Sequence, residues 1–301
     1  MSNNKSKLSN WLIKHPRLNP LRFSWSGSYR TLTASSRTFP DFMVIGFPKC
    51  GTKSLFSYVT QHPNIGIPTN YGKYFFDANF KRGINWYKAH YPTVKEKRKL
   101  KESNGAYVFG DYSARYMMYY PSALRIKKIV PKTKLIVVLR NPVERAYSQF
   151  NFKEMGRYRN EEKDLSLFSD AIQEDEKRLK DWEYMVENNL ITRENHVSIH
   201  TPYLTMGKYA VHLKEWFKIF PKEQFHFVST DNMSSELEIQ KTVSDVFKFL
   251  EVSDYKISDF SRKNVGSYEK IDPEERKVLS DYYRPFNEKL EELLNMKFNW
   301  S

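Results

Sequence analysis

The sequence of 301 residues contains a single cysteine, Cys50. One thiol cannot form an intramolecular disulfide, which excludes the small secreted domains that depend on disulfides for stability. No apolar run reaches the roughly 18 residues that a membrane-spanning helix needs, and no signal peptide is visible. These absences lead us to expect a cytoplasmic protein.

Acidic residues are missing from residues 1–40, which carry seven Lys and Arg and include Trp11 and Trp25. Pro16 and Pro20 argue against one long helix in this segment. Two interpretations stay open. The segment is either an arm packed on the domain surface or an anchor that makes peripheral contact with anionic lipid, where basic residues and Trp are favoured. We therefore divide the chain into an N-terminal arm, 1–40, and a single domain, 41–301.

The whole chain has few acidic residues relative to basic ones, with 35 Asp and Glu against 49 Lys and Arg and a net charge of +14. Aromatic residues make up 16% of the chain, which indicates a folded protein rather than a disordered one. A basic excess of this size favours acidic partners such as nucleotides, sulfated or phosphorylated sugars, nucleic acid or anionic membrane.

From residue 41 onward, short apolar runs alternate with helical patterns. This alternation predicts an α/β protein with a P-loop-like, three-layer fold, in which a central, mostly parallel sheet is flanked by helices. The expected strands are 42–45, 107–109, 134–139 and 225–228, and the expected helices are 52–61, 121–130, 142–155, 201–220 and 273–294, with one or two more within 160–193. Ligands of such sheets bind beyond the carboxyl ends of the strands.

Residues 42–54, FMVIGFPKCGTKS, are typical of a phosphate-binding loop. A buried strand runs into Gly46, a short loop follows, and a helix opens at Thr52. The first turn of a helix has backbone N–H groups without partners and a partial positive charge, so phosphate or sulfate binds well there. Lys49 adds a full positive charge, and the hydroxyls of Thr52 and Ser54 add donors. An ordinary strand–turn–helix junction is the alternative.

The loop departs from the Walker pattern of ATPases. Gly46 and Gly51 match the two glycines, but Thr52 stands where the lysine belongs, and the lysines fall at 49 and 53. In addition, the strand 134–139 ends in Arg140, where an NTPase would usually have an Asp that helps to hold magnesium. A cation at that position favours direct binding of an anion without a metal. Cys50 has no His in a catalytic pattern around it, so we expect a small side chain packed under the loop.

Four segments together resemble the PAPS-dependent sulfotransferases (PAPS is 3′-phosphoadenosine 5′-phosphosulfate), within them the heparan-sulfate-type and bacterial carbohydrate branch. The resemblance covers about residues 39–300. Its motifs are FPKCGTKS (47–54), GDYSARY (110–116), LRNPVERAYSQF (139–150) and the helix MGKYAVHLKEWFKIFP (206–221), followed by the terminal FNW.

The resemblance implies roles for individual residues. Lys49 would neutralise the leaving 5′-phosphate, and Arg140 and Ser148 would hold the 3′-phosphate. Lys263 falls where the loop that closes over the cofactor lies in the family. The 5′-phosphosulfate loop would comprise Lys49, Cys50, Gly51, Thr52, Lys53 and Ser54. The implied cofactor is PAPS, and no metal is required.

One position departs from the family. Heparan-sulfate-type enzymes carry K-E-x-x-[FHY]-F after the first helix, with the Glu as general base, but Gly72 stands at that Glu position here. We expect Asp111 to serve as the base instead, with a structural capping role as the alternative. Lys73 is expected to enter the site as a second cation. His62 suits the role of base less well, because it precedes Pro63 in an apparent turn.

The predicted function is transfer of a sulfuryl group from PAPS to a hydroxyl or amine of an acceptor. We expect the acceptor to be a carbohydrate, with no nucleic acid involved. Three alternatives stay open: a PAPS-binding fold without activity, a nucleotide-dependent kinase, and a polyanion- or nucleic-acid-binding protein. The sequence leaves the acceptor and the oligomeric state open.

Overall fold

The computed structural model describes residues 25–69, 74–154, 168–188, 202–263 and 268–300. At its centre is a five-stranded sheet in which every pairing is parallel, in the order β2-β3-β1-β4-β5. The strands are β1 (Phe42–Gly46), β2 (Ile65–Gly66), β3 (Val108–Tyr112), β4 (Lys134–Leu139) and β5 (Phe225–Ser229). The predicted α/β class with a parallel sheet is confirmed.

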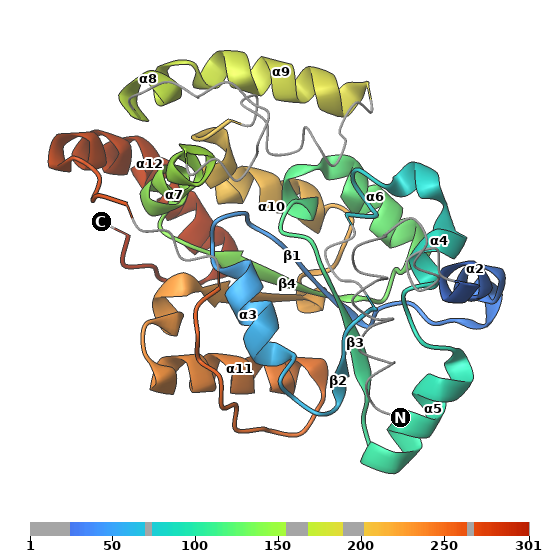
Figure 1. Cartoon of the computed structure of the whole chain (residues 1–301). Coiled ribbons are helices and arrows are strands. Elements are labelled where there is room, and N and C mark those ends of the chain that lie inside the picture. The colour runs from blue at the N-terminus through green and yellow to red at the C-terminus, as the bar shows by residue number, and fades with distance from the viewer. Residues whose placement is uncertain (1–24, 70–73, 155–167, 189–201, 264–267, 301) are drawn as a thin grey trace, which may run out of the picture.

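The central strand β1 is buried along its whole length because helices cover both faces of the sheet. Its register is fixed on both sides, with Phe42 opposite Gly110 of β3 and Lys134 of β4. In Figure 1, α3 (Thr52–Val59) and α11 (Glu236–Leu250) lie on one side of the sheet, and α6 (Tyr120–Ile129) and α10 (Tyr209–Phe217) lie on the other. The result is the expected three-layer arrangement.

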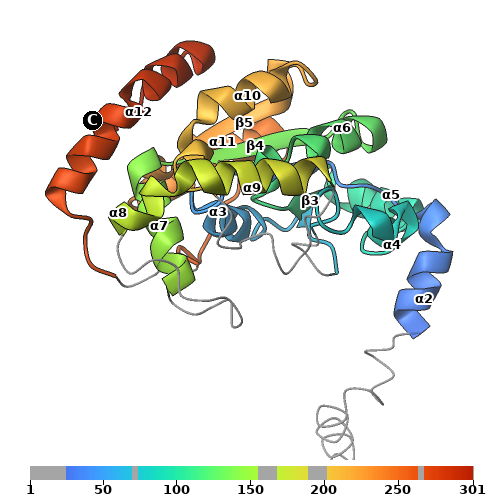
Figure 2. The same cartoon turned by 90° about the horizontal axis from the view of Figure 1, so that it is seen from above.

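A second hydrophobic cluster holds α7 (Pro142–Glu154) in place beside the sheet. Val143, Ala146 and Phe150 of this helix pack with Phe168 of α8 (Phe168–Gln173) and with residues of α12 (Pro273–Leu294). The helix α9 (Asp175–Glu187) follows α8, and both lie above α7 in Figure 1 and therefore nearest to the viewer in Figure 2. The cluster fixes the helix that begins just after β4.

Two expected elements differ from the structure. The helix expected over 201–220 is shorter: a 3-10 turn at Thr205–Gly207 precedes α10, and Lys208 (φ −79°, ψ 61°) breaks the helical path between them. Residue 201 lies outside the described residues. The strand expected at 107–109 instead starts at Val108 and continues to Tyr112, because β3 pairs with β1 through that residue.

Part of the expected N-terminal arm is packed on the domain. The helix α2 (Trp25–Leu32) and a 3-10 turn at Ala34–Ser36 contact α4 (Ile84–Lys88), which is followed by α5 (Val94–Asn104). Arg30 donates to the carbonyl of Ala89, and both Arg30 and Arg37 donate to that of Tyr91, so these guanidinium groups satisfy the free carbonyls beyond α4. Residues 1–24 lie outside the described residues. Within the described ranges, no helix is long and apolar enough to cross a membrane.

Candidate active site

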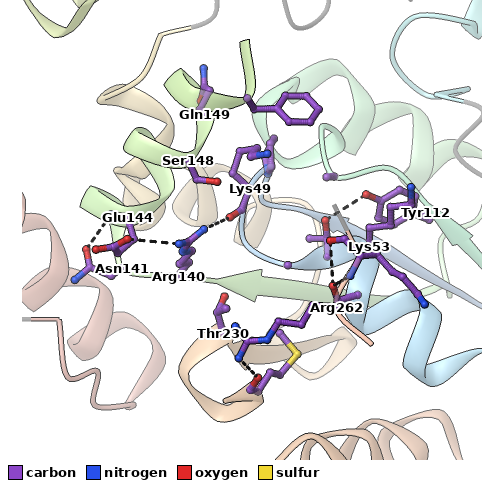
Figure 3. Close-up of a pocket in the computed structure, with 18 of the residues that line it drawn as sticks. Lys49, Lys53, Tyr112, Arg140, Asn141, Glu144, Ser148, Gln149, Thr230 and Arg262 are labelled. Carbon is purple, nitrogen blue, oxygen red and sulfur yellow. Dashed lines mark hydrogen bonds and ion pairs between the residues drawn. The ribbon is translucent and has the colours of Figure 1, made fainter. Parts of the chain in front are cut away.

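A cavity of about 580 Å³ opens at the carboxyl ends of the strands, where the fold predicts a ligand. Its wall is built by the loop after β1, the segments after β3 and β5, and the first turns of α7 (Figure 3). Six Lys and Arg line it against two acidic residues, Glu144 and Asp231. The cavity therefore favours an anionic ligand.

The loop after β1 approaches its neighbours so closely that glycine is needed at two positions. A Cβ on Gly46 would lie 2.5 Å from Cγ of Met117, and Gly51 has a φ of 80°, in the left-handed region that favours glycine. Lys49 also has a positive φ, 67°, and its ammonium lies 3.6 Å from the centroid of the Phe152 ring. The ring of Phe152, a residue of α7, thus holds Lys49 at the cavity wall.

The first turn of α3 presents the predicted hydroxyls and a second lysine to the cavity. Thr52, Lys53 and Ser54 all line it. The Thr52 hydroxyl lies 3.4 Å from the Tyr112 hydroxyl at the end of β3, which ties the start of α3 to the neighbouring strand. The loop and helix N-terminus therefore have the arrangement that an anion requires.

Cys50 belongs to the loop, but its side chain does not line the cavity. The thiol is fully buried, with Sγ 3.5 Å from the Tyr209 hydroxyl, and burial raises the pKa of Cys50. The Thr230 hydroxyl lies 2.8 Å from the carbonyl oxygens of both Cys50 and Leu139, and its one proton is shared between these two acceptors. Cys50 is thus a packing residue, and Thr230 fastens the loop to the end of β4.

Arg140 and Ser148 lie together on the β4 side of the cavity, as the motif spacing predicts (Figure 3). The Arg140 Nη1 donates to the carbonyl of Lys49 at 3.1 Å, and its Nη2 lies 3.5 Å from the Glu144 carboxylate. Asn141 begins α7 by accepting hydrogen bonds from the N–H groups of residues 143 and 144. The two predicted anion-binding segments are therefore joined by a direct hydrogen bond.

Lys263 also reaches the cavity, although more than 200 residues separate it from the loop. Its backbone N–H donates to the Ser54 hydroxyl at 2.9 Å, and its ammonium pairs with Asp259 at 3.1 Å. The neighbouring Arg262 lines the cavity too and donates to the carbonyl of Met233. The segment 262–263 thus lies over the start of α3.

Asp111, the expected general base, is not among the residues that line this cavity. It is 1% exposed, and burial raises its pKa. Its carboxylate accepts hydrogen bonds from the Tyr87 hydroxyl at 2.6 Å and from the N–H of Tyr112 at 2.8 Å. A base must reach the proton that it removes, so these contacts favour the structural alternative for Asp111. His62 is likewise buried, with its ring nitrogens bonded at 2.8 Å to the carbonyl of Ser253 and at 3.0 Å to the N–H of Asn64.

Lys73, the other expected catalytic residue, lies outside the described residues. The next residue in the chain, Tyr74, lines the cavity, and its ring lies 4.4 Å from the guanidinium carbon of Arg115.

Several lining residues were missed by the sequence analysis. Asp231 follows β5 and accepts a hydrogen bond from Trp300 at 2.7 Å, so the terminal FNW motif supports the cavity wall. The position of Thr230 and Asp231 at a strand end could have identified them. Arg115 belongs to the motif GDYSARY (110–116), but the sequence does not indicate which way its side chain faces.

These residues fit a 3′,5′-bisphosphate nucleotide. One set of donors and cations lies around the loop after β1, and a second lies at the start of α7, within one cavity. Among the residues that the structure describes, no group of three or more His, Cys, Asp and Glu is placed to hold a metal.

Comparisons with known proteins find one family of relatives. Residues 39–265 match the family model described as "Sulfotransferase domain". The chain is 26% identical over 322 residues to the "Membrane-associated sulfotransferase kil1" of Dictyostelium discoideum, covering 87% of this chain and 66% of that protein. It is 26% identical over 288 residues to the human "Heparan sulfate glucosamine 3-O-sulfotransferase 6", covering 88% of this chain and 74% of the relative.

Another relative is the "Bifunctional heparan sulfate N-deacetylase/N-sulfotransferase 1" of Caenorhabditis briggsae, 26% identical over 233 residues. The match covers 75% of this chain but only 24% of that protein. Among solved structures, the sulfotransferase from Alicyclobacillus acidocaldarius has the same fold, with a TM-score of 0.64 at 24% identity, covering 87% of this chain and 98% of that one.

Proposed function

This chain belongs to the sulfotransferase domain family, and we propose that it transfers a sulfuryl group from PAPS to a hydroxyl or amine of a glycan. The observation that carries the proposal is the hydrogen bond from Arg140 to the carbonyl of Lys49, 3.1 Å long. It joins the phosphate-binding loop to a second cation, Arg140 at the end of β4, within one cavity. A ligand with two separate phosphate positions uses both, whereas a nucleoside 5′-phosphate uses one.

The residues divide the binding of PAPS between them. Lys49 and the turn Thr52–Ser54 are proposed to hold the 5′-phosphosulfate, because they line the cavity at the N-terminus of α3. Arg140 and Ser148 are proposed to hold the 3′-phosphate, since a guanidinium can donate two parallel hydrogen bonds to phosphate. Lys263 is proposed to cover the nucleotide, because its backbone N–H donates to the Ser54 hydroxyl at the start of α3.

PAPS, when bound, supplies the sulfuryl group and a bisphosphate that departs with added negative charge. The role of the chain is to position the reactants and to stabilise that charge, as in phosphoryl transfer. Lys49 is the proposed main cation, kept at the wall by Phe152. Lys73 is proposed as a second cation, because its neighbour Tyr74 lines the same cavity.

The proposal assigns proton transfer to none of the described carboxylates. Glu144 already pairs with Arg140 and with Arg276, and Asp231 accepts hydrogen bonds from Trp300 and Ser229. Asp111 is buried and does not line the cavity.

A carbohydrate acceptor is supported by the heparan sulfate sulfotransferases among the relatives. The net charge of +14 is consistent with an acidic glycan.

The decisive test compares thermal stabilisation by 3′-phosphoadenosine 5′-phosphate (PAP) with that by ATP–magnesium, in wild type and in Lys49→Ala. We expect PAP to raise the melting temperature of wild type more than ATP–magnesium does, and the variant to lose much of that shift. Stabilisation by ATP–magnesium alone would favour a kinase instead. Labelled sulfate transfer from PAPS to a glycan panel then separates an active enzyme from a PAPS-binding fold without activity. Salt-dependent RNA binding that survives Lys49→Ala would favour a polyanion-binding protein.

We also propose that residues 1–24 make peripheral contact with anionic membrane. The segment carries Lys5, Lys7, Lys14, Arg17 and Arg22 around Trp11, and one relative is described as membrane-associated. Co-sedimentation with phosphatidylserine vesicles should fall in a variant lacking residues 1–24. Equal sedimentation of both proteins would refute this contact.

A further inference from the structure

Arg115 is a buried cation in the cavity wall that the cofactor assignment leaves unused. It is 5% exposed and lines the cavity. It follows β3, where the N–H of Ser113 still donates to the carbonyl of Val44 in β1 at 3.0 Å, so the backbone that carries it is firmly placed.

One edge of the Arg115 guanidinium is held by the buried Asp77. The Nε donates to Oδ2 at 3.0 Å, and Nη2 lies 2.8 Å from the same oxygen. The ring of Tyr74 covers the guanidinium, 4.4 Å from its carbon atom. Asp77 also accepts from the N–H of Ala78 at 2.6 Å, which fixes the carboxylate in turn. The guanidinium is therefore held in one orientation.

The other edge has no partner. Among the described residues, neither Nη1 nor Nη2 of Arg115 makes a hydrogen bond although both are buried, and of the two only Nη2 is close to the Asp77 carboxylate. A buried charged donor that stays unpaired is costly, and native proteins rarely keep one without a reason. Because Arg115 lines a cavity, the natural partner of Nη1 is a group that enters the cavity.

That group is distinct from the 3′-phosphate. Arg140 follows β4 and Arg115 follows β3, and these strands flank β1 on opposite sides. The loop after β1, with Lys49, lies between them in strand order. The proposed nucleotide takes the loop and the β4 side, which leaves the β3 side to the acceptor.

We propose that Arg115 forms an acceptor subsite that binds a carboxylate or sulfate group of an acidic glycan. This inference rests on the proposed function and makes it more specific. A guanidinium fixed on one edge presents planar, parallel donors on the other, which match a carboxylate or sulfate. The sulfuryl oxygens of PAPS have the same chemistry, and the experiment separates the two sources.

The test is calorimetric titration of the PAP-loaded protein with a heparin-derived tetrasaccharide and with the same tetrasaccharide after desulfation and carboxyl reduction. The main variant carries Asp77→Asn and Arg115→Gln together, so that no buried carboxylate loses its partner. Arg115→Lys keeps the charge beside Asp77. It tests the role of Arg115 in tetrasaccharide binding if the double variant fails to fold. Arg82→Gln is the control, because Arg82 also stacks on a ring, that of Trp86, but is exposed and does not line the cavity.

We expect wild type to bind the charged tetrasaccharide more tightly than the neutral one. The double variant should lose about 10- to 100-fold in affinity for the charged form only, while its affinity for PAP stays within about twofold. Arg115→Lys should show a smaller loss of the same kind, and Arg82→Gln should match wild type.

Two results would overturn the subsite: equal weakening of charged and neutral forms, or no preference for the charged form in wild type. A loss of PAPS affinity, measured in parallel and without loss of tetrasaccharide affinity, would assign Arg115 to the sulfuryl group instead. A failure of the proposed function is recognised by a different result, the absence of PAP binding to wild type. If PAP does not bind wild type, the titration is repeated without it, and Arg115-dependent binding of the charged form would then support the subsite alone.

Discussion

Replacing Arg140 by alanine should weaken the binding of PAP selectively, through its 3′-phosphate. The guanidinium lines the cavity beside Ser148 and is oriented by the Lys49 carbonyl at 3.1 Å and the Glu144 carboxylate at 3.5 Å. It is therefore already placed for a ligand, and little ordering of the side chain is needed on binding.

The expected loss of affinity for PAP follows from the type of hydrogen bond that is removed. A hydrogen bond to a charged group contributes about 1.5–3 kcal/mol, so Arg140→Ala should raise the dissociation constant of PAP about 10- to 150-fold. Ser148→Ala removes a neutral donor and should cost about 0.5–1.5 kcal/mol, or roughly 2- to 12-fold. Adenosine 5′-monophosphate lacks the 3′-phosphate, so its affinity should change little in either variant.

The assay is calorimetric titration of wild type and variants with PAP and with adenosine 5′-monophosphate. Arg276→Ala is the matched control, because Arg276 also pairs with Glu144 but comes from α12 and does not line the cavity. If Arg140→Ala weakened both nucleotides equally, Arg140 would act by supporting the Lys49 loop, and the 3′-phosphate assignment would be refuted.

Further substitutions test the remaining assignments. Lys49→Ala should lower kcat for sulfuryl transfer about 10²- to 10³-fold, and Phe152→Leu about 2- to 30-fold through the lost cation–π contact; unchanged kcat in both would remove Lys49 from the chemistry. Cys50→Ala should keep turnover, and native Cys50 should react slowly with iodoacetamide because burial raises its pKa; rapid labelling with loss of activity would contradict this. Asp111→Asn should also keep turnover, and a large fall in kcat at saturating acceptor would restore Asp111 as the base. Because burial raises the pKa of Asp111, its stabilising contribution is fully present below the unfolded value of about 3.9 and is lost as pH rises through the folded one. Urea unfolding should therefore show wild type losing stability relative to Asp111→Asn as pH rises above about 4.

The order and type of the main elements could be predicted because they depend on local patterns. The apolar run 42–45 becomes a central strand buried on both faces, and 134–139 becomes its parallel neighbour. Element ends were less certain, since pairing and packing decide them. β3 continues through Asp111 and Tyr112 because it pairs with β1, and the helix expected from residue 201 is interrupted at Lys208.

The fate of Asp111 shows why a strand-end residue need not be a site residue. Side chains of a strand alternate between its two faces. The Tyr112 side chain faces α3, where its ring lies 5.5 Å from that of Phe56, and it lines the cavity. Asp111, one residue earlier, contacts the hydroxyl of Tyr87 on the other face. The sequence placed Asp111 near the right strand end but did not show that the cavity would contain its neighbour Tyr112 instead.

The sequence by itself determined the anion-binding loop, the cation at the end of the next strand and the order of the segments, because each depends on residues close together in the chain. Only the tertiary structure decided which distant side chains meet. It joined Arg140 to the Lys49 loop, laid Lys263 over Ser54, buried Asp111 beside Tyr87 and placed Arg115, with Nη1 unpaired among the described residues, in the cavity wall. Those contacts depend on strand order and on which face each residue occupies, and packing over the whole sheet fixes both.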